Sequence, residues 1–224
     1  MTEKQKAQLL RKWREWLKKI DQYLGVLLVT HRVFEQVHKI ATSNKRTRSP
    51  MLFYNLLRNN YLISITIGIS KLGDPDKRSI SLYNLIEDIK KHPKVITRAY
   101  FVSGYHKQER EYGAADFDFN RFANKKNDFL SIRKLHKDLV RLKKELSVVR
   151  TFRNTWIAHL DIKRKMYKRP TYNDIAKALK AVDDLWSKYS LLLNRVERSS
   201  KPVLQYDWKE PLRHAWIEDD KQKE

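Results

Sequence analysis

Three side chains with complementary chemistry lie close together in the segment RTFRNTWIAHLD, residues 150–161. The imidazole of His159 can take a proton from a ribose 2′-hydroxyl, or give one to a leaving 5′-oxygen, because its ordinary pKa lies near neutral pH. The guanidinium of Arg153 stays charged and binds phosphate oxygens in pairs, so it can stabilise the charge of a phosphoryl-transfer transition state. Asn154 and Asp161 can orient the ring or the ribose. The residue types therefore favour metal-free phosphoryl transfer on RNA.

The spacing of these residues predicts a site that one helix alone does not complete. On an ideal helix, an apolar arc of about 80° would contain Val149, Phe152, Trp156 and Leu160. Arg153 and His159 would flank that arc, about 120° and about 9 Å apart. They converge only through the length of the arginine, a helix irregularity or a second copy of the helix. The alternative is that Arg153 pairs with a surface acid and His159 only complements the helix dipole.

The net charge indicates a polyanionic partner. The chain has 48 Lys and Arg against 26 Asp and Glu, which gives a formal charge of +22. Such a surface attracts polyanions and loses affinity as salt rises, and RNA is the partner that we expect. Near the histidine, the expected phosphate-binding residues are Arg150, Lys163, Arg164 and Lys165. A membrane surface or an acidic protein partner remains the alternative to RNA.

Several classes of site have no support in the sequence. There is no cysteine, so disulfides and thiolate zinc sites are excluded. The histidines lack carboxylates at metal-ligand spacing, and no phosphate-binding or dinucleotide-binding glycine motif is present. We therefore expect neither a metal nor a cofactor. No apolar run approaches the about 20 residues that span a bilayer, and we expect a cytoplasmic protein without a membrane partner.

The residue pattern predicts an all-α fold. Glycine (5) and proline (6) are scarce, and apolar residues recur at helical intervals. The expected helices cover about residues 3–41, 50–72, 82–91, 95–112, 128–159 and 172–195. Thr171 and Asp174 form a capping box before the last helix. We expect Gly73 to end the second helix in a left-handed conformation, the following turn to reverse the chain, and residues 113–126 to form a loop.

The helices divide the chain into a core bundle with an extension at each side. Residues 1–49 are expected to form an amphipathic helix and a basic loop, and residues 50–197 an up-and-down helical bundle. Residues 198–224 form either an arm packed on the bundle or on a partner subunit, or a disordered tail. We expect these parts to make a single domain overall.

The chain resembles the HEPN superfamily in its abortive-infection branch. The signature of that superfamily is an arginine, a polar residue and, after four to six intervening positions, a histidine; here five positions separate Arg153 from His159. Two further segments resemble the second and third helices and the last helix of such proteins: YLISITIGISKLGDPDKRSISLYNLIEDI (61–89) and TYNDIAKALKAVDDLWSKYSLLLNRV (171–196). The similarity extends over about residues 52–196, and the Arg-to-His motif is its only specific part.

The resemblance implies a metal-independent endoribonuclease, acting as a toxin or antiphage effector, with an active site assembled across a homodimer. By this likeness Arg153 would bind phosphate, His159 would be the acid–base group and Asn154 would position the substrate. A cognate antitoxin or sensor protein is a further expected partner. Toxins silenced by adenylylation often carry tyrosine two residues after the histidine, where this chain has Asp161. The alternative is a non-catalytic HEPN-like module that binds RNA or protein.

Overall fold

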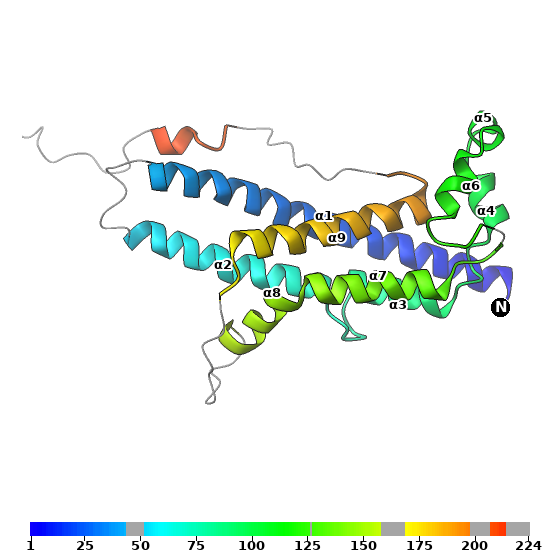
Figure 1. Cartoon of the computed structure of the whole chain (residues 1–224), viewed down its shortest axis with the longest axis horizontal. Coiled ribbons are helices and arrows are strands. Elements are labelled where there is room, and N and C mark those ends of the chain that lie inside the picture. Colours follow the sequence, from blue (N-terminus) through cyan, green and yellow to red (C-terminus); the bar gives the residue numbers. More distant parts are fainter. Residues whose placement is uncertain (44–51, 126, 158–168, 198–206, 214–224) are drawn as a thin grey trace, which may run out of the picture.

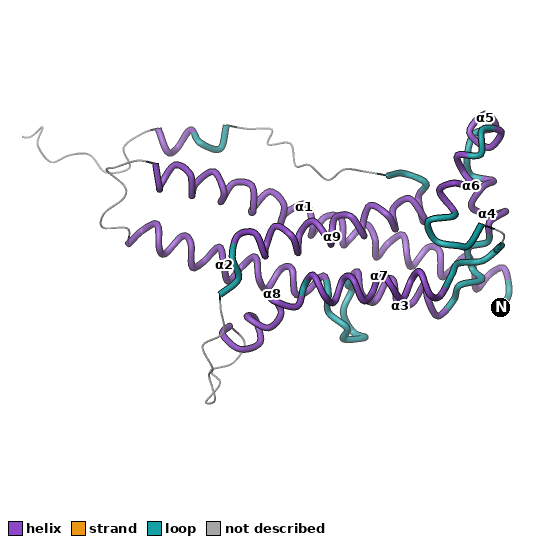
Figure 2. Tube along the Cα trace, viewed as in Figure 1, coloured by secondary structure: helices purple, strands orange, loops and turns teal. Residues whose placement is uncertain are grey.

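The computed structural model describes residues 1–43, 52–125, 127–157, 169–197 and 207–213, and all regular structure within these ranges is helical (Figure 2). The α-helices are α1 (Glu3–Ser43), α2 (Leu52–Leu72), α3 (Leu82–Lys91), α4 (Arg98–Ser103), α5 (Lys107–Glu111), α6 (Ala114–Phe119), α7 (Ile132–Glu145), α8 (Ser147–Phe152) and α9 (Tyr172–Asn194). A π-helical segment, η1 (Arg153–Ile157), follows α8, and a 3₁₀ turn, η2 (Glu210–Arg213), lies near the C-terminus. The predicted all-α fold is confirmed for the described residues.

The long helix α1 is the scaffold along which the other long helices align (Figure 1). Its buried side chains recur every three or four residues, which gives one continuous apolar face: Leu10, Trp13, Leu17, Ile20, Leu24, Leu27 and Phe34. Helices α2 and α9 pack against this face, and α7 packs between α3 and α9. Successive long helices run in opposite directions, which is the up-and-down order that the sequence predicts.

Helix α3 continues along α1 in the direction of α2, so the expected reversal of the chain is wrong. His38 of α1 contacts Tyr54 of α2, whereas Trp13, near the start of α1, donates its indole N–H to Asp88 of α3 (2.8 Å). The chain therefore runs antiparallel to α1 through both α2 and α3. The segment that connects these two helices is a loop that does not change the direction of the chain. Ser81 caps α3, because its hydroxyl accepts a hydrogen bond from the N–H of Asn84 (3.0 Å).

Gly73 is needed for close packing rather than for a left-handed turn, which corrects our prediction. Among the described residues, positive φ angles occur at Gly113 and Arg195. A Cβ atom on Gly73 would lie 2.4 Å from Cδ2 of Leu146, a buried residue at the end of α7. The end of α2 and the end of α7 therefore meet so closely that a Cβ at position 73 would require the Leu146 side chain to shift.

The region between α3 and α7 is more helical than expected. The predicted helix over 95–112 is divided into α4 and α5, and the predicted loop over 113–126 contains α6. Thr97 caps α4 through a hydrogen bond from the N–H of Tyr100 (3.1 Å), and Gly113, with φ 74°, allows the chain to turn between α5 and α6. Local caps and a positive φ angle thus cut one periodic stretch into short helices.

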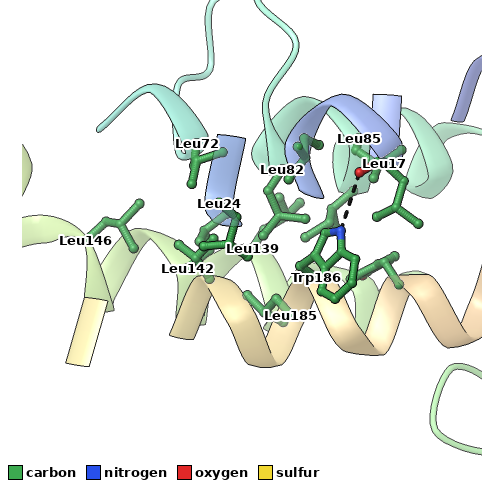
Figure 3. Close-up of a cluster of buried hydrophobic side chains, with 14 of the residues drawn as sticks. Leu17, Leu24, Leu72, Leu82, Leu85, Leu139, Leu142, Leu146, Leu185 and Trp186 are labelled. Atoms are coloured by element: carbon green, nitrogen blue, oxygen red, sulfur yellow. Dashed lines mark hydrogen bonds between the residues drawn. The ribbon is translucent and has the colours of Figure 1, made fainter. Parts of the chain in front are cut away.

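The predicted helix over 128–159 is also interrupted. It begins at Ile132, after the cap Ser131, and stops at Leu146, whose ψ angle of −4° is not helical. Buried leucines from α1, α2, α3, α7 and α9 form one cluster with Trp186, and Leu146 lies at the edge of that cluster (Figure 3). From that point α8 leaves the line of α7 (Figure 1). The interruption sets the direction in which the Arg-containing segment leaves the bundle.

The last long helix begins as predicted. The hydroxyl of Thr171 accepts a hydrogen bond from the N–H of Asp174 (3.1 Å), and the Asp174 carboxylate accepts one from the N–H of Thr171 (2.8 Å). Most of the predicted C-terminal arm, residues 198–224, lies outside the described residues. Within the described part of the chain, no helix is both long enough and apolar enough to cross a bilayer.

Candidate functional site

The first half of the Arg-to-His motif forms the π-helical turn η1, at the exposed end of α8. In a π-helix the hydrogen bonds join residues five apart, and such turns are frequent at functional sites. The hydroxyl of Thr155 donates to the carbonyl oxygen of Thr151 (2.9 Å), which is the acceptor that the N–H of residue 155 would use in an α-helix. The turn is therefore widened where Arg153 begins it. The angles around the helix axis that we derived for Arg153 and its neighbours from an ideal α-helix therefore do not apply within this segment.

Aromatic packing anchors this turn to the bundle. Val149 and Phe152 are buried, as their spacing predicts, and Trp156 is half-buried with its ring stacked 6.2 Å from that of Phe152. The turn also packs against α2. Leu160, the fourth member of the expected apolar face, lies outside the described residues. Within the described part of the chain, Phe152, Trp156 and α2 thus hold the backbone that carries Arg153.

The guanidinium of Arg153 has one donor, Nε–H, without an acceptor among the described residues. The side chain is half-buried, and its Nε–H is inaccessible to solvent and has no hydrogen-bond acceptor among the described residues. Leaving such a donor unpaired lowers the free energy of unfolding by about 1–3 kcal/mol. Substituting most surface side chains changes that free energy by less. The alternative pairing of Arg153 with a surface acid does not occur within the described part of the chain. The described part of the chain thus leaves this donor available for an acceptor.

The other predicted site residues divide into two groups. Arg150, one turn before Arg153, is half-buried, and Asn154 is exposed beside it, so α8 and η1 bring these three residues together. The remaining predicted residues lie outside the described residues: His159, Asp161, Lys163, Arg164 and Lys165. Their roles, and the roles of the first group, remain predictions.

Sequence reasoning missed one residue that contacts the motif. The guanidinium of Arg169 lies over the ring of Trp156, 5.7 Å from its centroid, in a cation–π arrangement. Arg169 directly precedes Pro170 and the cap of α9, and a basic residue before a helix start is the signal that would have found it. A second cation therefore stands beside η1, contributed by a different part of the chain.

The histidines of α1 have a structural role instead. Nδ1 of His31 lies 2.6 Å from the hydroxyl of Tyr61, and Nδ1 of His38 contacts the hydroxyl of Tyr54. Burial lowers the pKa of His31, although the nearby carboxylate of Glu35 opposes that shift. No group of three potential metal-ligating side chains occurs among the described residues. These histidines join α1 to α2.

The comparisons with known proteins agree with the fold. The family model HEPN_AbiU2, described as AbiU2, matches residues 10–211. No curated protein and no solved structure matches the chain. The matched range includes all of α2 to α9 and the whole Arg-to-His motif. The chain belongs to the HEPN_AbiU2 family, in the abortive-infection branch of the HEPN superfamily.

Proposed function

We propose that the protein is a metal-independent endoribonuclease of the HEPN type, which acts in the cytoplasm as a toxin or antiphage, abortive-infection effector. Its substrate is RNA, and its active site contains Arg153, Asn154 and His159. The observation that carries this proposal is the solvent-inaccessible Nε–H of Arg153, which has no acceptor in the described part of the chain and lies at the start of a π-helical turn. Family membership and the charge of +22 support it.

The proposed reaction is a transesterification within the RNA. His159 takes the proton of the ribose 2′-hydroxyl, and the 2′-oxygen forms a bond to the adjacent phosphorus. Arg153 binds the non-bridging phosphate oxygens, where negative charge accumulates as the bond to the 5′-oxygen breaks. A proton returned to that oxygen completes the step. The products are a 2′,3′-cyclic phosphate and a 5′-hydroxyl end.

The proposed enzyme works as a homodimer. The resemblance to HEPN proteins implies that a second copy completes the active site, whereas the ideal-helix separation of Arg153 and His159 does not hold through the π-helical turn. Asp161 is proposed to position the imidazole or the ribose, and the cluster Arg150, Lys163, Arg164 and Lys165 to hold the flanking phosphates. A cognate antitoxin or sensor would keep such a nuclease silent.

The proposal is tested with purified full-length protein and mixed structured and single-stranded RNAs in EDTA. We expect cleavage by the wild type, with a loss of about 10²–10³-fold in Arg153→Ala and about 10²–10⁴-fold in His159→Ala. The matched control is Arg110→Ala, which removes an exposed arginine from α5, at the opposite end of the bundle from α8 (Figure 1). Its activity should equal that of the wild type.

Two results would count against the proposal. Full activity in both motif variants would show that these residues do not perform the reaction. RNA binding without cleavage at every protein concentration would instead favour the alternative function, a non-catalytic HEPN-like module that binds RNA or protein. Thermal unfolding of each variant shows whether a lost activity reflects a lost fold.

A further inference from the structure

A pocket of about 280 Å³ opens beside the π-helical turn, between α2 and the start of α9. We call it the α2–α9 pocket, and its lining residues are Arg58, Tyr61, Leu62, Arg169, Pro170, Thr171, Tyr172 and Ile175. Small-molecule sites usually measure about 300–1,000 Å³, so this volume suits one nucleotide-sized group rather than a larger ligand.

The pocket is basic, and its two cations come from different elements. Arg58 is exposed on α2, and Arg169 is exposed immediately before α9. Neither guanidinium has a carboxylate partner within the described part of the chain. Among the described residues, no carboxylate lines the pocket, and the nearby Asp174 is already bound to the N–H and hydroxyl of Thr171 (2.8 and 2.7 Å). Two unneutralised guanidiniums at one cavity are suited to a phosphate.

Aromatic rings supply the other half of a nucleotide site. Tyr172 is half-buried at the pocket wall, with its ring 4.9 Å from that of His38. Behind it, Tyr61 stacks on Phe34 with their centroids 3.9 Å apart, and its hydroxyl bonds to His31. These contacts hold the aromatic wall rigid. A base can stack on such a ring whatever its identity, because every base has a π face.

The pocket is physically joined to the motif. Arg169, which lines the pocket, also lies over the ring of Trp156 in η1. The same π-helical turn begins with Arg153, whose Nε–H lacks an acceptor among the described residues. Arg169 and Trp156 thus connect the pocket to the turn that begins with Arg153.

We propose that the α2–α9 pocket binds one nucleotide of single-stranded RNA, next to the nucleotide that is cut. The phosphate lies between Arg58 and Arg169, and the base stacks on Tyr172. This inference rests on the proposed function, because it assigns a substrate contact to the same site. It also identifies the substrate as a strand with unpaired bases, since a base within a duplex cannot enter a pocket of this kind.

The test measures binding of a fluorescent single-stranded RNA oligonucleotide to the full-length protein, over a range of salt concentrations in EDTA. We expect Arg58→Ala and Arg169→Ala each to weaken binding about tenfold and to reduce the slope of log affinity against log salt by about 0.7. Arg58→Lys and Arg169→Lys should restore that slope, because the charge returns. The control Arg110→Ala should change neither quantity.

A second measurement addresses the base. Tyr172→Ala removes the stacking surface and should weaken binding about tenfold, whereas Tyr172→Phe keeps the ring and should bind as the wild type does. Because Tyr172 also contacts His38, thermal unfolding of Tyr172→Ala is recorded beside it. If Tyr172→Ala remains folded and binds RNA with unchanged affinity, the stacking assignment is wrong.

The outcomes separate this inference from the proposed nuclease. Unchanged RNA affinity in both arginine variants would show that the α2–α9 pocket does not bind the RNA. The proposed nuclease would still be supported if cleavage depends on Arg153 and His159. If the arginine variants bind RNA more weakly but the wild type never cleaves it, the pocket is an RNA-binding site and the proposed nuclease activity is wrong. The same titrations with free uridine and adenosine monophosphates give the remaining outcome: if these bind through Arg58 while RNA affinity is unchanged, the pocket serves free nucleotides and our assignment to RNA is wrong.

Discussion

At the scale of single residues, the most informative side chain is an arginine with a donor that the described chain does not satisfy. Arg98 shows the ordinary situation, because its guanidinium donates to Asp116 (2.6 Å), to Asn120 (2.9 Å) and to nearby backbone carbonyls. Arg153 has a solvent-inaccessible Nε–H with no acceptor among the described residues. Because an unpaired buried donor destabilises the fold, the two arginines should respond differently to the same substitution.

The first prediction compares Arg153→Met with Arg98→Met. Methionine keeps most of the aliphatic stem and removes every donor. In Arg153→Met we expect an unchanged or higher unfolding temperature, because an unpaired donor is lost, together with a fall in RNA cleavage of about 10²–10³-fold. In Arg98→Met we expect a fall in the unfolding temperature of several degrees, since its partners lose their donor. A marked destabilisation of Arg153→Met would contradict the proposed role.

A second residue-scale prediction concerns Asp183 of α9. Burial, and then the neighbouring Asp184 carboxylate, raise its pKa to about 6. The unfolded chain has an ordinary aspartate pKa of about 3.9, so the folded state binds the extra proton between about pH 4 and pH 6. The free energy of unfolding therefore rises as the pH falls from about 6 to about 4. At pH 7, where the carboxylate is charged in both states, its burial destabilises the fold by the full amount.

Asp183→Asn should remove that penalty. We expect it to raise the free energy of unfolding at pH 7 by about 1 kcal/mol, a value reduced from the full shift because the half-exposed group is screened by solvent. Near pH 4 the gain should vanish. The control is Asp184→Asn: burial raises the pKa of Asp184, but bonds from Lys180 and Arg141 outweigh it and lower the pKa. That variant should lose stability at pH 7, and chemical denaturation at both pH values distinguishes the two.

At the scale of elements, the orientation of the motif depends on where α7 ends. Leu146 closes α7 against Gly73 at the end of α2, and α8 departs from that point. The widening of the helix at Arg153 is a second irregularity, six residues after α8 begins. Two breaks within one apparently continuous helical pattern thus determine the direction of the Arg-containing turn.

Gly73→Ala tests the first of these breaks. The new Cβ would lie 2.4 Å from Cδ2 of the buried Leu146, so the junction must shift. We expect a loss of about 1–3 kcal/mol in unfolding free energy and a fall in cleavage. The control is Gly25→Ala, where nothing lies within 4 Å of the added Cβ and where alanine should stabilise the interior of α1 by about 1 kcal/mol. Equal stability of the two variants would contradict the packing account.

Sequence periodicity predicts the long elements well and the interruptions poorly. The bounds of α1, α3 and α9 follow from apolar spacing together with the caps Ser81 and Thr171, since both signals are local. The break at Leu146 was not predictable, because it lies inside one periodic apolar pattern, and the packing of Leu146 beside Gly73, which is distant in the sequence, is seen only in the fold. Within the site, the residue types at Arg153 and Asn154 were evident, whereas the π turn and the contact of Arg169 with Trp156 required the fold.

At the scale of the whole molecule, a long helical bundle carries a large positive charge, with the motif near one end (Figure 1). The +22 charge gives a general attraction for nucleic acid, and the site residues must supply the chemistry. Basic side chains also stand apart from the motif, for example the exposed Arg133 and Lys137 of α7. Binding should therefore depend on the whole surface, and cleavage on a few residues.

The corresponding prediction concerns salt. Log affinity for single-stranded RNA should fall linearly with log salt, with a slope of about −0.7 per phosphate contacted. A strand that contacts about five phosphates would lose about a hundredfold in affinity between about 0.05 and 0.2 M salt. Arg153→Met should change this slope by no more than one contact. Affinity that does not respond to salt, or binding to anionic vesicles but not to RNA, would contradict RNA as the partner.

The proposed metal-independent transesterification is tested most directly with two substrates: a single-stranded RNA, and its analogue with 2′-deoxyribose at the cleaved position. Both are incubated with the wild-type protein in EDTA. We predict that the RNA is cut to a 2′,3′-cyclic phosphate and a 5′-hydroxyl end, and that the analogue is not cut there, because the attacking oxygen is missing. Cleavage of the analogue at the same position, or cleavage that requires a divalent metal, would contradict a metal-independent transesterification by Arg153 and His159.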